Sequence, residues 1–191
     1  MKRLLVLLFV GALALTGCAT GDSTVDVNNG GEFRFVAGTP RGDVIATQAR
    51  AAAPEFDGTL LDGGRFSSGE LDGDIAVVNF WGSWCPPCRV ESPEFQDVYA
   101  DVRDRGVQFL GINVKDTDQL ARAFEENFGI QYPSLADPRG EVALAFRDYP
   151  ASAIPSTIVL DRQARVAAVY TGAVAQADLR DVLDLLMAEE D

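Results

Sequence analysis

The chain has 191 residues, 47% of them hydrophobic, which suits one globular domain with an appendage. Its formal net charge of −13 argues against a nucleic-acid-binding surface, which needs clustered Lys and Arg. With no His and three Cys, the sequence also excludes Ser–His–Asp and Cys–His catalysis and a four-ligand Cys/His zinc site. Any catalysis must therefore use thiols, carboxylates, Lys, Tyr or the backbone.

Residues 1–18 are typical of an export signal. A basic start is followed by an apolar run over residues 4–15, which is shorter than the roughly 20 residues needed to span a bilayer. The run ends in Leu-Thr-Gly-Cys18, which resembles the bacterial lipobox, in which the Cys is joined to diacylglycerol and becomes the new N-terminus. The resemblance implies lipidation of Cys18 and a mature protein anchored outside the cytoplasmic membrane. The alternative is ordinary signal cleavage nearby that leaves Cys18 as an unpaired thiol.

Residues 19–53 are rich in Gly, Thr, Asp, Asn and Ala, and residues 28–31 form the breaker cluster Asn-Asn-Gly-Gly. No sustained hydrophobic period is present. We therefore predict a flexible tether over 19–53, with a small strand or hairpin added to the domain as the alternative.

Residues 54–191 predict one α/β domain with a mixed sheet. Residues 56–66 predict two short strands around a glycine turn, and the continuous apolar run over 75–80 predicts a strand covered on both faces. A helix should run from Cys85 to about Arg105, followed by a second buried strand over 107–114.

The later elements should alternate and end in a hairpin and a helix. Asp116 or Thr117 can cap a helix that carries Leu120, Phe124 and Phe128 and ends before Gly129. The remaining predicted elements are a strand at 132–136, a helix at 141–146, hairpin strands at 157–160 and 166–170, and an amphipathic helix at 177–187 with Leu179, Val182, Leu183 and Leu186 on one face.

The motif Trp84-Cys85-Pro86-Pro87-Cys88 lies between the first buried strand and its helix. Cys85 should occupy the helix N-cap, exposed, where the helix dipole favours its thiolate. Cys88 should lie one turn inside, less accessible. This predicts that Cys85 attacks a substrate disulfide and Cys88 resolves the mixed disulfide. The alternatives are a structural disulfide or half of a metal site.

The segment Ile154-Pro155-Ser156-Thr157 precedes the terminal hairpin. It resembles the cis-proline loop of thioredoxins, which packs against the Cys-x-x-Cys motif and offers backbone groups to an extended substrate. We therefore predict a cis bond before Pro155, with a trans Pro at the start of an edge strand as the alternative.

Residues 77–93, Val-Val-Asn-Phe-Trp-Gly-Ser-Trp-Cys-Pro-Pro-Cys-Arg-Val-Glu-Ser-Pro, resemble the TlpA/ResA-type branch of the thioredoxin superfamily. Gly111-Ile112-Asn113-Val114, Tyr132-Pro133, Asp137 and Tyr149 agree, and the resemblance covers about 54–187. It implies a thioredoxin fold, with a mixed central sheet flanked by helices, an N-terminal β-hairpin and a helical insertion at 117–130. It also implies reduction of disulfides in extracytoplasmic partners, often apocytochromes c, with electrons from a membrane thiol carrier and no cofactor or metal beyond the redox-active disulfide.

Two positions near the motif qualify this resemblance. Asn79 stands where cytosolic thioredoxins carry a buried Asp that accepts a proton from the resolving Cys, and Asn cannot ionise. Glu91 lies three residues after Cys88 and resembles the acidic residue that this branch uses near its thiols. We predict that Glu91 raises the thiol pKa values and accepts the proton of Cys88, a solvated helix carboxylate being the alternative.

The substrate-binding surface should consist of Trp84, Pro86, Pro87, Ile154 and Pro155, whereas Trp81 should pack in the core. Because Pro86 and Pro87 remove two N–H donors and no imidazole is present, the thiolate should be weakly stabilised, which predicts a reductant. The alternatives are a disulfide oxidase, a Cu(I) carrier that would lack the His of related copper-delivery proteins, and a peroxidase, which would need Thr where Gly82 stands.

Overall fold

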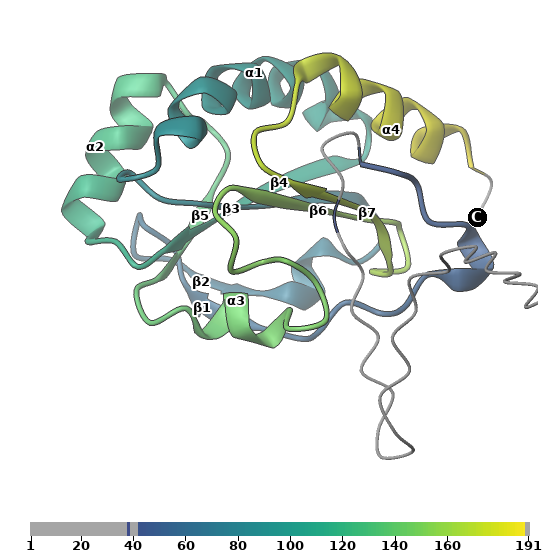
Figure 1. The fold of residues 1–191 in the computed structure, drawn as a ribbon, viewed down its shortest axis with the longest axis horizontal. Helices are drawn as coiled ribbons and strands as arrows, with labels where there is room; N and C mark the ends of the chain where they lie inside the picture. Colours follow the sequence, from purple (N-terminus) through teal and green to yellow (C-terminus); the bar gives the residue numbers. More distant parts are fainter. Residues whose placement is uncertain (1–37, 39–41, 190–191) are drawn as a thin grey trace, which may run out of the picture. The chain divides into compact units, whose positions relative to one another are not determined.

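The computed structural model describes residue 38 and residues 42–189, so Cys18 and the proposed signal segment lie outside the described residues. A five-stranded sheet forms the centre, with strand order β5-β4-β3-β6-β7 (Figure 1). Strands β3 (Ile75–Trp81), β4 (Val107–Val114) and β5 (Ser134–Asp137) are parallel, whereas β6 (Ser156–Leu160) and β7 (Val166–Thr171) run antiparallel to their neighbours. The predicted mixed sheet and terminal hairpin are confirmed.

Strand β3 is buried along its whole length because both faces of the sheet are covered. Ile75 and Val77 pack beneath α1 (Pro86–Val102) and α4 (Gln176–Ala188). Ala76, Val78 and Phe80 face the opposite layer, which holds α3 (Glu141–Ala145) and the hairpin β1–β2 (Asp57–Thr59 and Arg65–Ser67) (Figure 1). This alternation explains why the strand reads as an unbroken apolar run.

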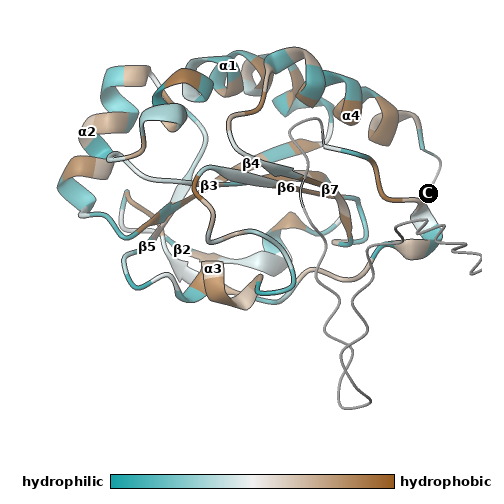
Figure 2. Ribbon diagram, viewed as in Figure 1, coloured by the Kyte–Doolittle hydropathy of each residue, from teal (hydrophilic) through white to brown (hydrophobic). Residues whose placement is uncertain are grey.

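The helices are banded in apolar and polar residues, as expected when one face is buried (Figure 2). The predicted apolar face of α4 is confirmed, since Leu179, Val182, Leu183 and Leu186 are all buried. Helix α2 (Asp118–Phe128) occupies the predicted insertion, with Thr117 as its N-cap. Its first turn buries Ala121 rather than Leu120, which is exposed. None of the described helices is long and apolar enough to cross a bilayer.

The prediction of a flexible tether over 19–53 is wrong for residues 42–53. This segment follows the outer edge of β7, with bridges from Val44 to Ala168 and from Ala52 to Arg165, and contains a short 3₁₀ helix, Thr47–Ala49. The physical reason is that β7 ends the sheet and leaves backbone groups unpaired, which these residues satisfy. The pairing uses isolated bridges and single backbone hydrogen bonds rather than a regular strand, so the sequence of this segment shows no hydrophobic period.

Arg50 fastens this segment to the domain. Its guanidinium, with a side chain only 1% exposed, donates to Glu189 at the end of α4 and to Asp161 after β6, at 2.6–3.2 Å. Arg165 also binds Asp161. Residues far apart in sequence therefore meet in a buried charge cluster that joins the N-terminal segment to the C-terminal helix.

Replacing Arg50 with Ala should lower the free energy of unfolding by about 3 kcal/mol, because Glu189 loses its arginine partner and the buried Asp161 loses one of its two arginine partners. Arg65→Ala is the matched control: its ion pair with Asp57 is 75% exposed on the arginine side and should contribute less than about 1 kcal/mol. Urea unfolding of both variants measures the difference. Equal losses would show that the Arg50 cluster does not hold the segment.

Candidate active site

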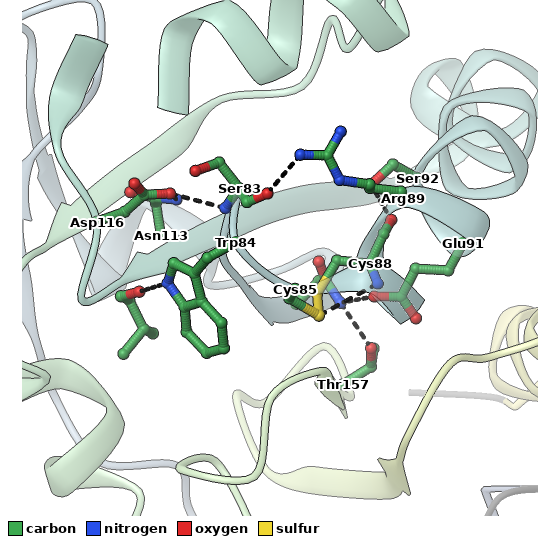
Figure 3. The surroundings of a disulfide bond; sticks show 12 residues. Ser83, Trp84, Cys85, Cys88, Arg89, Glu91, Ser92, Asn113, Asp116 and Thr157 are labelled. Carbon is green, nitrogen blue, oxygen red and sulfur yellow. Dashed lines mark hydrogen bonds between the residues drawn. A yellow bond between two sulfur atoms is a disulfide. The ribbon is translucent and has the colours of Figure 1, made fainter. Parts of the chain in front are cut away.

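Cys85 and Cys88 form a disulfide at the start of α1, directly after the buried strand β3 (Figure 3). Cys85 is the N-cap, and its Sγ accepts a hydrogen bond from the backbone N–H of Cys88 at 3.2 Å. Pro86 and Pro87 occupy the first two helical positions and have no N–H to donate. The placement of both cysteines agrees with the prediction, and the sulfur of Cys85 meets a single N–H of the helix end.

The prediction that Cys85 is exposed is wrong for this oxidised pair, because Cys85 is only 1% exposed and Cys88 is fully buried. The two sulfurs belong to an apolar cluster with Trp81 and Phe124, against which Ile154 packs. Joined in a disulfide, the sulfurs carry no charge and pack as apolar atoms. A thiol from another molecule that attacks this disulfide must therefore displace part of the apolar surface around the sulfurs.

An apolar rim borders the buried disulfide. Trp84 is 52% exposed, and Pro86, Pro87 and Val90 are exposed beside it in sequence. Trp81, by contrast, is 3% exposed and its ring centroid lies 4.7 Å from that of Phe124, which agrees with its predicted place in the core. Several exposed apolar side chains therefore lie next to the disulfide.

The predicted cis peptide bond between Ile154 and Pro155 is confirmed. Pro155 is buried, and its carbonyl accepts from the N–H of Gly172 at 2.9 Å. The antiparallel pairing of Phe80 with Ser156 brings this loop to the end of β3, where the cysteines follow. Residues about seventy positions apart in the chain thus form one site, as the motif comparison predicted.

Glu91 is 1% exposed and lies on the same side of α1 as Cys88, near the disulfide in Figure 3. Its carboxyl oxygens accept from the Nδ2 of Asn79 at 3.1 Å and from the N–H of Val174 at 3.1 Å. Burial raises the pKa of Glu91 from 4.5 to about 7; the two hydrogen bonds oppose this rise and the nearby Glu94 adds to it. The alternative of a solvated helix carboxylate is therefore wrong.

Asn79 links Glu91 to the cis-proline loop. The same Nδ2 atom also donates to Oγ1 of Thr157 at 3.0 Å, two residues after Pro155. Asn79 is buried on the α1 side of β3 and does not ionise, so it holds the carboxyl group without competing for its proton. The titratable group next to the disulfide is thus Glu91.

Gly82 leaves room for the indole of Trp84. A Cβ atom at this position would lie 2.6 Å from Nε1 of Trp84, which is too close for a side chain. The Thr that a peroxidase needs here therefore has no space with Trp84 in this position. Among the described residues no group of three or more Cys, Asp, Glu or His is placed to hold a metal ion.

Comparison with known proteins agrees with this geometry. Residues 49–169 match the AhpC/TSA family. The thiol-disulfide oxidoreductase ResA of Geobacillus kaustophilus is 30% identical over 139 residues, covering 73% of this chain and 78% of that protein.

This chain belongs to the AhpC/TSA family. Within it, the chain is a thiol–disulfide oxidoreductase of the ResA type. The secreted thiol-disulfide isomerase of Corynebacterium glutamicum superposes with a TM-score of 0.73 at 34% identity, covering 78% of this chain and 93% of that one. A DsbF homologue from Corynebacterium diphtheriae gives 0.71 at 37% identity, covering 76% and 92%.

Sequence reasoning missed several residues of this ResA-type site. Val174 binds Glu91 through its backbone, which no side-chain pattern reveals. The sequence pattern predicts for Asp116 only a possible helix cap, yet Asp116 accepts a hydrogen bond from the backbone N–H of Ser83, two residues before Cys85. Its place at the end of a parallel strand next to β3 was the available signal.

The raised pKa of Glu91 predicts a pH-dependent stability of the oxidised protein. Between pH 4.5 and about 7 the folded chain keeps the Glu91 proton that the unfolded chain releases, so rising pH favours unfolding. Relative to Glu91→Gln, the wild type should lose up to about 1.4 kcal/mol of unfolding free energy per pH unit in this window. Urea unfolding at several pH values between 4.5 and 8 measures the difference.

Glu126→Gln, on the exposed side of α2, controls for the change in net charge and should follow the wild-type curve. Parallel curves for the wild type and Glu91→Gln would contradict the burial of an ionisable Glu91.

Proposed function

We propose that this chain is an extracytoplasmic, lipid-anchored protein-disulfide reductase. The observation that carries the proposal is the Cys85–Cys88 pair at a helix start that offers the sulfur one N–H, with the carboxyl group of Glu91 buried on the Cys88 side. The export signal at residues 1–18 and the similarity to a secreted thiol-disulfide isomerase support the location. Lipidation of Cys18 would provide the anchor.

In the proposed reaction the reduced protein begins as a dithiol. The thiolate of Cys85 attacks one sulfur of the partner's disulfide, forms a mixed disulfide and releases the partner's other sulfur as a thiolate. Cys88 then loses its proton to Glu91 and attacks Sγ of Cys85, which expels the second partner thiolate. The partner gains two electrons and two protons, and the chain ends as the disulfide described above.

The direction of electron flow follows from how little the site stabilises a thiolate. Pro86 and Pro87 remove two N–H donors from the helix start, and no imidazole is present in the sequence. An ionised Glu91 would further disfavour negative charge on the sulfurs. A poorly stabilised thiolate makes the disulfide form more stable, which corresponds to a low reduction potential.

The partners that fit the site are exported proteins whose disulfides lie in extended or unfolded segments. Trp84, Pro86 and Pro87 offer apolar contact, and the loop at Ile154 and Pro155 would lie along the bound backbone. Apocytochromes c are the substrates that the TlpA/ResA-type resemblance implies. Electrons would come from a membrane thiol carrier, as the TlpA/ResA-type resemblance implies; no cofactor is proposed.

Replacing Cys88 with Ser should trap substrates, because the mixed disulfide at Cys85 can no longer be resolved. Non-reducing gels of membranes from cells expressing the full chain should show adducts that dithiothreitol releases. Cys85→Ser is the matched control and should give no such adducts. A separate variant, Cys18→Ala, tests the lipid anchor and should move the protein out of the membrane fraction. Adducts with Cys85→Ser but not with Cys88→Ser would reverse the two roles.

The reduction potential of the Cys85–Cys88 pair should lie near that of thioredoxin, about −270 mV, and well below the value of about −120 mV for the strong oxidant DsbA. Equilibration with glutathione and dithiothreitol buffers, followed by alkylation and mass spectrometry, measures it. A potential close to that of DsbA would favour the disulfide-oxidase alternative and overturn the proposed direction.

A further inference from the structure

The short loop Gly82-Ser83-Trp84, which leads from β3 to Cys85, is bound by the end of the neighbouring strand β4. The backbone N–H of Ser83 donates to Oδ2 of Asp116 at 2.7 Å. Nε1 of Trp84 donates to the carbonyl of Val114 at 3.2 Å (Figure 3). Both acceptors lie at the junction between β4 and α2, so this junction sets where the residues before Cys85 lie.

The carboxylate of Asp116 is itself fixed in place. Nδ2 of the buried Asn113 donates to Oδ2 at 3.3 Å, and the N–H of Thr117 donates to Oδ1 at 2.9 Å. Burial alone would raise the pKa of Asp116, but these hydrogen bonds and those from Ser83 hold it below its ordinary value. At neutral pH Asp116 is therefore a charged acceptor with both oxygens engaged.

The other side of the loop is held by α1. Nη2 of Arg89 donates to the carbonyl of Ser83 at 2.9 Å, and its guanidinium lies 5.8 Å from the ring centroid of Phe124. The N–H of Cys85 donates to the carbonyl of Gly82 at 3.1 Å. Both peptide groups of Ser83 are thus occupied, and Cys85 has little freedom to move away from Cys88.

We propose that Asp116 is a positioning residue that shifts the redox equilibrium of the Cys85–Cys88 pair toward the disulfide by holding the Ser83–Trp84 loop. The reason is the effective concentration of one thiol at the other. When Cys85 is held beside Cys88, the chain loses less conformational freedom as the disulfide forms. A loosened loop gives that freedom mainly to the dithiol form, which is not cross-linked. The inference requires only that the pair exchanges with thiols and is independent of the proposed direction and substrate.

The test compares Asp116→Ala with Asp116→Asn, which removes the charge but keeps an oxygen that can accept from Ser83. Asp118→Ala is the matched control, since Asp118 is exposed two residues further on and does not bind the loop. The oxidised full-length variants are equilibrated with dithiothreitol redox buffers, and alkylation of the peptide that carries Cys85 and Cys88 gives the dithiol fraction.

Asp116→Ala should shift the equilibrium about fivefold toward the dithiol, the equivalent of one lost hydrogen bond and about 20 mV. Asp116→Asn should stay within about twofold of the wild type, and Asp118→Ala should match it. Acrylamide quenching provides an independent readout, because the chain has two Trp and Trp81 is buried. Quenching of the Trp84 emission should rise in oxidised Asp116→Ala alone.

Two results would overturn the inference. In one, Asp116→Ala is less stable to urea but keeps the wild-type equilibrium and quenching, which would reduce Asp116 to a structural residue. In the other, Asp116→Asn shifts the equilibrium as far as Asp116→Ala with unchanged quenching, which would assign the effect to charge rather than to loop position. Failure of the proposed reductase function would appear in other measurements. The wild-type Cys85–Cys88 pair would then have a high reduction potential, or Cys88→Ser would form no adducts, and neither result depends on Asp116.

Discussion

The site depends on the pairing of one strand, β3, with a parallel neighbour, β4, on one side and an antiparallel neighbour, β6, on the other. On one side the parallel register with β4 places Trp81 opposite Asn113, so the junction that carries Asp116 lies beside the loop before Cys85. On the other side the antiparallel register with β6 places Phe80 opposite Ser156, so the cis-proline loop lies beside the same end. Because side chains alternate along a strand, a slip of one residue in the pairing with β6 would turn Thr157 away from Asn79.

Burial on both faces of β3 also creates the electrostatic character of the site. Glu91 and Asn79 lie in the layer between the sheet and α1, where a charge is costly and hydrogen bonds are few. The protein meets this cost by giving the carboxyl group two donors and by raising its pKa to about 7. A carboxyl group that exchanges its proton near neutral pH is thereby kept next to a pair of thiols whose own reaction releases protons.

The same layer explains why the disulfide is buried while its borders are exposed. The sulfurs pack with Trp81 and Phe124, whereas Trp84 and the two prolines face solvent. The buried sulfurs and the exposed apolar side chains thus lie on adjacent parts of one surface.

Much of the fold and the core of the site could be predicted from local patterns. The buried run over 75–80, the capped helix after Thr117 and the apolar face of α4 each follow from period and capping, which act within a few residues. The Cys-x-x-Cys spacing places both sulfurs on one helical turn, and the motif around Pro155 identified the cis loop. The N-terminal segment could not be recognised, because its pairing with the edge of β7 uses backbone groups and one buried Arg50 whose acidic partners lie more than one hundred residues away.

The residues and their spacing specify the chemistry: two thiols one turn apart at a helix start, two prolines between them, a carboxyl group on the next turn and no imidazole. How that chemistry is tuned depends on tertiary contacts. The burial of Cys85, the two donors on Glu91 and the hold of Asp116 on Ser83 all arise from contacts between different elements. Residue identity and spacing act locally along the chain, whereas burial and pKa depend on which distant groups the packed sheet brings within hydrogen-bonding distance.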